Sequence, residues 1–564
     1  MTKNFYGNNF NKFLREDGWF FLPLLVLNFP IFCQPFAYGA GISEGIVSYC
    51  FGAVEILLFC QVIYFGLSKF PCAKIFLQIT VLVAYSIFCV IDIFLILKFH
   101  AFLQKHIIQI ILETNLNESK EFLQSYVFEP KVIGGAATAL ILIFTEIKKL
   151  QKFIERSSEK TLRKFSCCIL IILLPAVVML FCYVFTLNFN VVKNLPADTI
   201  LGRTAVNIYS AIKSVNHDKE IFAEWDKHAE KITLNNSKVP YVVFVIGEST
   251  TRNHMQLYGY KLENNPLLTK RFERGEIFKF NDVIACGNHT REVMELMFTF
   301  SEKEDEESTW YKKYNFLDIV RRADYHTAWI SNQTATDYWG NMDKMYSMRC
   351  DEKFFAPLKK DSLWARNFDS VLFPALDEFI SRAHEKNFYC VHLNGTHSPY
   401  SYCYPAEFEK FTAADEDKTT EKAKEITAEY DNSVLYNDFV MDEIFKRFED
   451  KNALIIYISD HGQEICENGS NFAGHSDEKF ENRSMIEIPM LIWTSKSFRE
   501  MYPEKIDALK NSVDNPYRTD LIIHTILDLM DIQTESFDAT KSIVNEKFDK
   551  FRPRIYNNKP YHKN

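Results

Sequence analysis

Long apolar runs in the first 190 of 564 residues constrain this chain more than any other feature. A helix needs about 20 apolar residues to cross the hydrocarbon core of a bilayer. Five runs approach or reach that length, and the first and the last carry no charge: residues 19–36, 45–68, 75–97, 132–145 and 165–187. Because so many runs follow one another, buried helices of a soluble domain are the weaker explanation. The sequence predicts an N-terminal transmembrane bundle of five helices over residues 1–190.

Basic residues between the runs predict how this bundle is oriented. Lysines and arginines precede the first run, separate the second from the third, and crowd the segment between the fourth and the fifth. Cytoplasmic loops carry such an excess of basic residues, and these are alternate loops. With five spans, everything after residue 190 then lies outside. The exported part holds five cysteines, an odd and sparse set, so no disulfide scaffold is expected and pairing of Cys350 or Cys403 stays open.

The remaining residues divide into a connector, 191–239, and an α/β domain, 240–564. The connector holds an amphipathic stretch suited to the membrane surface. The domain is marked by apolar runs of strand length, separated by helical patterns: 241–247, 325–331, 388–393, 453–459 and 488–493. Such strands alternating with helices are typical of a mostly parallel sheet covered on both faces. The acidic second half of a chain with net charge −9 argues against a nucleic-acid partner.

Carboxylates and imidazoles follow several of these predicted strands where each strand ends. Glu248 follows the first strand, His392 and His397 come at and after the end of the third, and Asp460 and His461 follow the fourth. In open α/β sheets, ligands bind outside the carboxyl ends of the strands, so these side chains are expected at one edge. Each has an ordinary structural explanation when taken singly. Together they suit Zn²⁺ or Mn²⁺ rather than calcium.

A candidate nucleophile lies in the segment FNDVIACGNHTREVMELMFTF, where a short apolar run and a glycine turn precede a helical pattern. Thr290 stands at the start of that helix. Backbone N–H groups and the helix dipole favour an anion such as phosphate there. A metal bound to the threonine oxygen would lower its pKa and make it a nucleophile. The alternative is a plain threonine N-cap, which the nearby metal set makes less attractive.

These segments resemble the alkaline phosphatase/sulfatase superfamily and, within it, the bacterial membrane phosphoethanolamine transferases. The branch that modifies the core heptose of lipopolysaccharide looks most similar. The resemblance covers essentially the whole chain and rests on VVFVIGESTTRNHMQLYGY, AWISNQ, VHLNGTHSPY, YDNSVLYNDFV, YISDHGQE and IPMLIWTS. GESTxR followed by SDHG is the most specific part of it. The resemblance implies that the C-terminal α/β domain is sulfatase-like.

The resemblance also implies a chemistry and roles for individual residues. Thr290, activated by zinc, would take phosphoethanolamine from phosphatidylethanolamine, release diacylglycerol, and pass the group to a lipopolysaccharide or lipooligosaccharide acceptor, at core heptose or lipid A. One tightly bound Zn²⁺ is implied, while a second ion and Mn²⁺ stay open. The implied metal ligands are Glu248, Thr290, Asp460 and His461, and the residues toward substrate or a second metal are His397, His475, Gln333 and Glu118.

Some residues depart from the pattern of the lipid A-type members. Gln333 and Asp337 stand where those members carry Asn and Lys, and Leu296 stands where they carry a Cys. These departures fit the core-sugar branch better than the lipid A branch.

The expected setting is the bacterial inner membrane, crossed several times, with the catalytic domain in the periplasm. The expected partners are the bilayer, the phosphatidylethanolamine donor and a lipopolysaccharide or lipid A acceptor. Two alternatives stay open: a glycerolphosphate transferase similar to lipoteichoic acid synthase, and a non-catalytic membrane receptor or transporter. Glu55 and Asp92, which fall inside predicted spans, are compatible with transport and equally with pairing inside the bundle or a place near its ends. A true sulfatase is disfavoured because the GNHTR turn lacks the Cys or Ser of a CxPSR-type signature.

Overall fold

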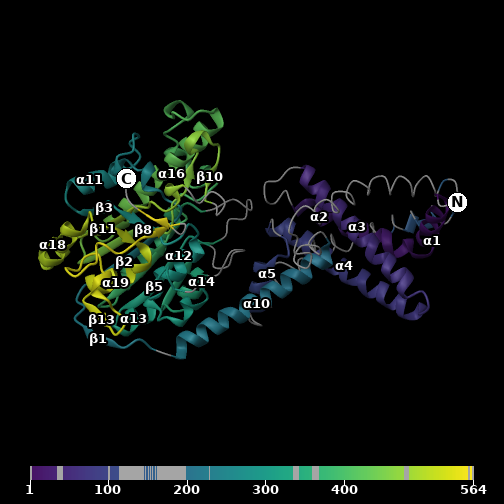
Figure 1. Cartoon of the computed structure of the whole chain (residues 1–564), viewed down its shortest axis with the longest axis horizontal. Helices are drawn as coiled ribbons and strands as arrows, with labels where there is room; N and C mark the ends of the chain where they lie inside the picture. The colour runs from purple at the N-terminus through teal and green to yellow at the C-terminus, as the bar shows by residue number, and fades with distance from the viewer. Residues whose placement is uncertain are drawn as a thin grey trace. The chain divides into compact units, whose positions relative to one another are not determined.

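The computed structural model describes residues 3–34, 42–99, 102–113, 199–227, 229–305, 307–333, 342–357, 367–475, 482–556 and 559–561, with ten residues between 145 and 161. The chain divides into two compact units (Figure 1). The first comprises residues 1–216 and 360–363, and the second comprises residues 217–359 and 364–564.

The described part of the first unit is helical. Its helices are α1 (Lys3–Leu27), α2 (Phe29–Cys33), α3 (Ile42–Gly66), α4 (Pro71–Phe99), α5 (Lys105–Glu113) and the start of α10 (Ile200–Lys227). Among the described residues, three helical segments are long and apolar enough to cross a membrane: Phe10–Cys33, Ile42–Gly66 and Pro71–Ile96. They coincide with the first three predicted spans. The fourth and fifth predicted spans lie outside the described residues, and so does Glu118.

The intramembrane carboxylate Asp92 has a structural role in this unit. It forms a buried ion pair with Arg203 at the start of α10, and its Oδ1 accepts a hydrogen bond from the backbone N–H of Leu103 at 2.9 Å. Arg203 also donates to Gln34 Oε1 at 3.2 Å. The side chain of Asn28 accepts from the N–H of Ile200 at 3.0 Å. These contacts fix the start of α10 to the apolar helices, so Asp92 needs no transport role to explain it.

The second unit is built on a seven-stranded sheet in the order β3-β11-β8-β2-β7-β5-β6. The strands are β2 (Tyr241–Gly247), β3 (Ile277–Phe280), β5 (His326–Ser331), β6 (Glu352–Phe355), β7 (Asn387–His392), β8 (Ala453–Ser459) and β11 (Met490–Thr494). The five apolar runs in the sequence form β2, β5, β7, β8 and β11, with ends within two residues of the prediction. Two-stranded ladders flank the sheet: β1 (Ile232–Asn235) with β13 (Ile532–Thr534), β4 (Val283–Ile284) with β12 (Tyr517–Arg518), β9 (Glu464–Ile465) with β10 (Ala473–Gly474), and β14 (Ile555–Tyr556) with β15 (Lys559–Pro560).

The sheet is mixed, whereas the sequence predicted a mostly parallel one. The four pairings from β8 through β2, β7 and β5 to β6 are parallel, but β11 runs antiparallel to both β8 and β3. Between β8 and β11 the described chain holds short 3₁₀ segments and the β9–β10 ladder, and no α-helix crosses the sheet. A parallel pairing needs such a crossover. The chain therefore re-enters the sheet from the edge at which β8 ended.

Helices cover both faces of this sheet, as Figure 1 shows. One apolar core packs the even-numbered residues of β2 against α12, α13, α14, α18 and α19, and the other packs Val243 and Val245 against α11, α15 and α16. This division follows from the alternation of side chains along a strand. The helices are α11 (Pro266–Glu273), α12 (Thr290–Met297), α13 (Phe316–Arg322), α14 (Met342–Ser347), α15 (Phe373–Ser381), α16 (Glu421–Lys446), α17 (Lys496–Met501), α18 (Pro503–Ser512) and α19 (Ile522–Leu529).

Strand register brings the candidate ligands together at the carboxyl edge. Gly247 at the end of β2 pairs with Ser459 at the end of β8. The next residues, Glu248 and Asp460, therefore emerge side by side. Glycine is required nearby: a Cβ at Gly462 would lie 2.1 Å from the carbonyl oxygen of Ser484, and Gly395, with φ of +55°, packs against the backbone of Glu248. These close approaches hold the loop after β7 against the loop after β2, and the loop after β8 against Ser484, which precedes β11.

Candidate metal centre

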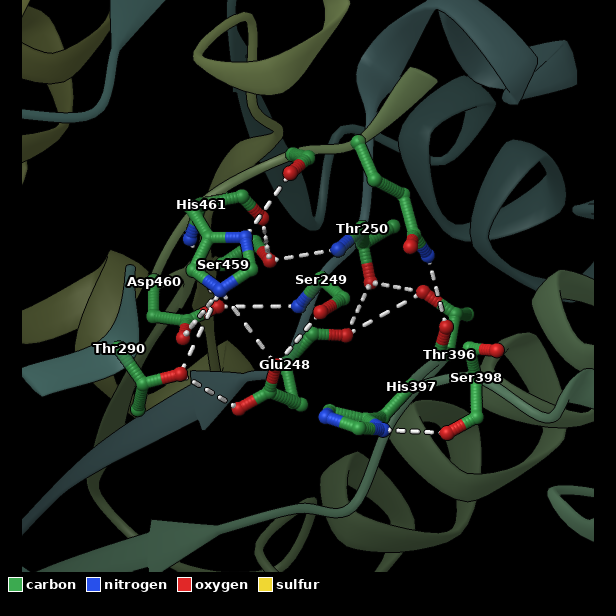
Figure 2. A network of polar contacts seen from close by, with 12 residues as sticks. Glu248, Ser249, Thr250, Thr290, Thr396, His397, Ser398, Ser459, Asp460 and His461 are labelled. Carbon is green, nitrogen blue, oxygen red and sulfur yellow. Dashed lines mark hydrogen bonds and ion pairs between the residues drawn. The ribbon is translucent and has the colours of Figure 1, made fainter. Parts of the chain in front are cut away.

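Glu248, Asp460 and His461 form the metal-ligand set of the described residues. Each offers one ligand atom, and these atoms all lie within 4.8 Å of one another. The three residues are at most 2% exposed. Figure 2 shows them converging, with the Thr290 side chain pointing at the same place. Glu248 leaves the end of β2, and the other two leave the end of β8, as the sequence predicted from the strand ends.

The loop after β2 is held in a strained conformation by its contacts with these ligands. Ser249 has a φ of 61°, in the left-handed region that non-glycine residues rarely adopt. Its backbone N–H donates to Asp460 Oδ1 at 2.9 Å, and its hydroxyl donates to Glu248 Oε1 at 2.5 Å. Both carboxylates are thereby oriented by one residue, which leaves Glu248 Oε2 and Asp460 Oδ2 directed at the centre.

The tautomer of His461 suits metal binding. Its Nδ1 lies 2.8 Å from the carbonyl oxygen of Gly462 and must be the donor there, so a lone pair remains on Nε2. Nε2 lies 3.4 Å from Asp460 Oδ2 and 3.6 Å from Glu248 Oε1. Burial alone would lower the pKa of His461, but the two carboxylates outweigh it and the pKa is raised. The three side chains together therefore attract a cation.

A zinc ion fits this arrangement. Asp460 Oδ2 is fully buried and has no hydrogen-bond partner among the described residues. Two buried carboxylates in contact with one imidazole are costly without a neutralising charge. Zinc takes four nitrogen and oxygen ligands in a tetrahedral arrangement. The Thr290 hydroxyl supplies a fourth donor, since Oγ1 lies 3.2 Å from Glu248 Oε2 and 3.4 Å from His461 Nε2.

Thr290 is the first residue of α12, as the sequence predicted. His289 precedes it in an extended conformation at the N-cap, and the backbone carbonyl of His289 accepts from the N–H of Val293 at 3.1 Å. The first N–H groups of a helix have no intrahelical partner and favour an anion. The threonine hydroxyl is therefore placed between a metal-ligand set and a site that favours negative charge.

Three further histidines lie around this centre. The ring of His475 lies 4.4 Å from the ring of His461 and 4.8 Å from that of His289, measured between centroids. Burial and then His461, His289 and His397 lower the pKa of His475 to about 2, so its ring is neutral. His397, in the loop after β7, donates from Nδ1 to the carbonyl oxygen of Ser398 at 2.6 Å. The sequence predicted roles for His397 and His475 but not for His289, whose signal was its place beside Thr290.

His392 belongs to a different contact network, beneath the centre. It is completely buried at the end of β7, and its Nδ1 lies 2.9 Å from both oxygens of Asp343. Trp329 and Ser331 also donate to Asp343 Oδ1. Burial alone would lower the pKa of His392, but Asp343 outweighs it and raises the pKa to about 9. His392 is therefore held as a charged partner of Asp343.

Gln333 connects two strand ends. Its backbone N–H donates to the hydroxyl of Ser331 at 2.9 Å, and its side-chain amide donates to the carbonyl oxygen of Leu393 at 2.9 Å. These contacts tie the end of β5 to the loop after β7, close to His397 in sequence. Its described contacts are structural.

A second buried polar cluster lies around Asp431 of α16, on the face of the sheet that α11, α15 and α16 cover. Asp431 accepts from the Tyr260 hydroxyl at 2.9 Å and from the Asn264 amide at 3.2 Å. Glu416, only 6% exposed, lies beside it, with the Lys261 ammonium 3.5 Å from its Oε2. Burial raises the pKa of both carboxyl groups, and the Asp431 charge raises that of Glu416 further. The cluster therefore favours holding a proton near neutral pH.

The fold and the centre define a class of protein. Residues 240–532, more than half of the chain, match the family described as Sulfatase, so the chain belongs to the sulfatase family. Within the first unit, residues 57–193 match a family described as Phosphoethanolamine transferase EptA/EptB. The resemblance drawn from the motifs is confirmed at this level.

Individual relatives agree with both matches. The chain is 28% identical over 484 residues to phosphoethanolamine transferase EptC of Escherichia coli O18:K1:H7, covering 81% of this chain and 79% of the relative. It is 25% identical over 468 residues to phosphoethanolamine transferase EptA of Escherichia coli K12, covering 80% and 82%. The crystal structure of the C-terminal periplasmic domain of Escherichia coli EptC in complex with Zn aligns with a TM-score of 0.53 and 29% identity, covering 57% of this chain and 91% of that domain.

Proposed function

We propose that this protein transfers phosphoethanolamine from phosphatidylethanolamine to a lipopolysaccharide or lipooligosaccharide acceptor, at core heptose or lipid A, through an ester on Thr290. The observation that carries the proposal is the Thr290 hydroxyl, 3.2 Å from Glu248 Oε2 and 3.4 Å from His461 Nε2, at the start of a helix. The EptC and EptA relatives support the group that is transferred. The zinc complex of the EptC domain supports the metal.

Glu248, Thr290, Asp460 and His461 would hold the zinc. When bound, zinc supplies positive charge that lowers the pKa of a ligating hydroxyl and offsets the charge on a phosphoryl oxygen. The chain's own residues do the rest. The Thr290 hydroxyl donates toward Glu248 Oε2, which orients Oγ1, and Ser249 fixes that carboxylate from the other side. The N–H groups at the start of α12 face the phosphoryl oxygens.

The reaction then proceeds in two displacements at phosphorus. In the first, Thr290 Oγ1 loses its proton and bonds to phosphorus while the bond to the diacylglycerol oxygen breaks, and that oxygen leaves with its electron pair and takes up a proton. In the second, an acceptor hydroxyl loses its proton and bonds to phosphorus, and Thr290 Oγ1 leaves with its electron pair and takes up a proton, which restores the hydroxyl. Each displacement uses one lipid substrate at a time, which suits a site reached from a membrane surface.

The membrane unit supports the proposed location of this chemistry. The three apolar helices and the basic residues in alternate loops favour a multi-pass protein of the bacterial inner membrane. The same charge pattern favours a periplasmic position for the metal centre. Both lipid substrates would be available from the outer face of that membrane.

Intact-mass spectrometry tests the proposed intermediate. The zinc-loaded full-length protein, mixed with phosphatidylethanolamine and no acceptor, is expected to gain the mass of one phosphoethanolamine group on the peptide containing GNHTR. Thr290→Ala should show no gain, whereas Thr290→Ser keeps a hydroxyl and should be modified. A glycerolphosphate adduct formed from phosphatidylglycerol would favour the alternative transferase. Absence of any adduct in protein shown to be active would refute the threonine ester.

A further inference from the structure

His289 lies next to the nucleophile in the chain, yet its side chain does not serve the start of the helix. It occupies the N-cap of α12 with φ of −134° and ψ of 134°, and its ring makes no capping hydrogen bond. N-cap side chains usually accept from the second or third helical N–H, and Ser, Thr, Asp and Asn do this best. A histidine at this position is therefore not explained by helix capping.

The ring of His289 instead joins a row of imidazoles drawn from separate segments. His461 follows β8, His475 follows β10, and His289 precedes α12, with ring centroids 4.4 and 4.8 Å apart in that order. The row passes beside Thr290, since His461 Nε2 lies 3.4 Å from its Oγ1. Glu248 Oε2 lies beside the same hydroxyl, 3.2 Å from Oγ1. The nucleophile thus contacts a carboxylate and the first imidazole of the row.

Burial separates the inner residues of the centre from the outer ones. Glu248, Asp460 and His461 are at most 2% exposed. Thr290, His289, His397 and His475 are half-buried instead. A substrate reaches Thr290 from the half-buried side, where it meets the imidazoles. Imidazole N–H groups donate to phosphate oxygens whether the ring is neutral or charged, so these residues can bind a phosphoryl group.

We propose that His289 donates a hydrogen bond to a non-bridging oxygen of the phosphoryl group that Thr290 receives. This inference rests on the proposed function and adds a substrate-contacting residue to it. In an in-line displacement, the leaving oxygen lies on the far side of phosphorus from the attacking oxygen. Because His289 precedes the attacking residue in the chain, the contact is assigned to the equatorial oxygens, which lie nearer to Thr290 Oγ1 than the leaving oxygen does. His289 therefore binds the group and does not protonate the departing diacylglycerol.

Isothermal titration of inorganic phosphate into zinc-loaded full-length protein tests this role. His289→Asn keeps a favoured N-cap residue and removes the imidazole. Because a hydrogen bond to a charged group is lost, the variant should bind phosphate at least about tenfold more weakly. Its zinc content should be unchanged. His217→Asn, a change at a partly exposed histidine of α10, is the matched control and should bind phosphate like the parent.

Several outcomes would overturn the inference. Phosphate affinity equal to the parent's would exclude the contact, and loss of zinc would make His289 a metal ligand instead. If His289→Asn fails to fold, His289→Ser supplies a second N-cap residue without an imidazole and the same comparison applies. With the donor lipid, kcat/KM should fall by the same factor as phosphate affinity. Because phosphate binding needs neither lipid, weaker binding without any threonine adduct would uphold His289 and refute the proposed function.

Discussion

Removal of Arg203 should destabilise the membrane unit far more than removal of an exposed charge. The side chains of Arg203 and Asp92 are 5% and 0% exposed, and they are paired with each other. In Arg203→Met, Asp92 keeps the single hydrogen bond from Leu103 N–H. Breaking a buried ion pair from one side costs about 3–5 kcal/mol, because the remaining charge stays buried without its partner. Asp92→Leu should cost a similar amount for the same reason.

The double variant distinguishes this explanation from loss of packing. Replacing both members of a buried pair with apolar residues is often neutral or stabilising. Arg203→Met combined with Asp92→Leu should therefore recover most of the stability that either change loses alone. The control is Lys12→Ala, which removes one member of an exposed ion pair. Lys12 Nζ lies 3.8 Å from Glu16 Oε1, and its loss should lower the free energy of unfolding by less than about 1 kcal/mol.

The measurement is the free energy of unfolding of the full-length protein in mild detergent, obtained by titration with a denaturing detergent. The parent, the two single variants and the double variant form a double-mutant cycle, which gives the interaction free energy between Arg203 and Asp92. If Arg203→Met and Asp92→Leu each lower the free energy of unfolding by no more than Lys12→Ala does, the buried ion pair does not stabilise the unit as argued. A double variant whose loss equals the sum of the two single losses would lead to the same conclusion.

Two further predictions concern the second unit. Asp460→Asn and His461→Gln should lose zinc on dialysis against a chelator, as measured by metal analysis. His326→Gln, a change in the sheet remote from the centre, should retain zinc. Full zinc retention by both Asp460→Asn and His461→Gln would contradict their assignment as metal ligands. The second prediction concerns pH. The folded state raises the pKa of Asp431 and Glu416 above their ordinary values, so it binds more protons than the unfolded chain and stability should fall as pH rises from about 4 to about 7. Glu416→Gln mimics the protonated form, so its melting temperature should fall less than the parent's between pH 5 and pH 8; equal falls would contradict the assignment.

The parts of the centre that depend on local sequence were predictable. Each apolar run ended at a polar residue, and parallel strands end at one edge, so Glu248, Asp460 and His461 could be grouped without coordinates. Thr290 could be placed because a glycine turn and a helical pattern flank it. These inferences use only the order of residues along one strand or one helix.

Other features depend on contacts between distant residues. The direction of β11 is set by the missing helical crossover after β8, and an apolar run looks the same in either direction. Asp92 suggested transport because its partner, Arg203, is 111 residues away. His289 lacked a role in the sequence because the ring of His475, 186 residues later in the chain, contacts it only through the fold. Periodicity and spacing along the chain carry no information on such pairs.

The burial of the metal ligands beneath half-buried residues has a consequence for metal exchange. A chelator that approaches from the half-buried side, past Thr290 and His475, would take the route that the proposed donor lipid takes. A phosphoryl group esterified to Thr290 would lie on that route and bring its own negative charge. Enzyme that carries the phosphoryl ester should therefore release zinc more slowly than unmodified enzyme. The rate of zinc loss would then measure how long the ester persists before an acceptor removes it.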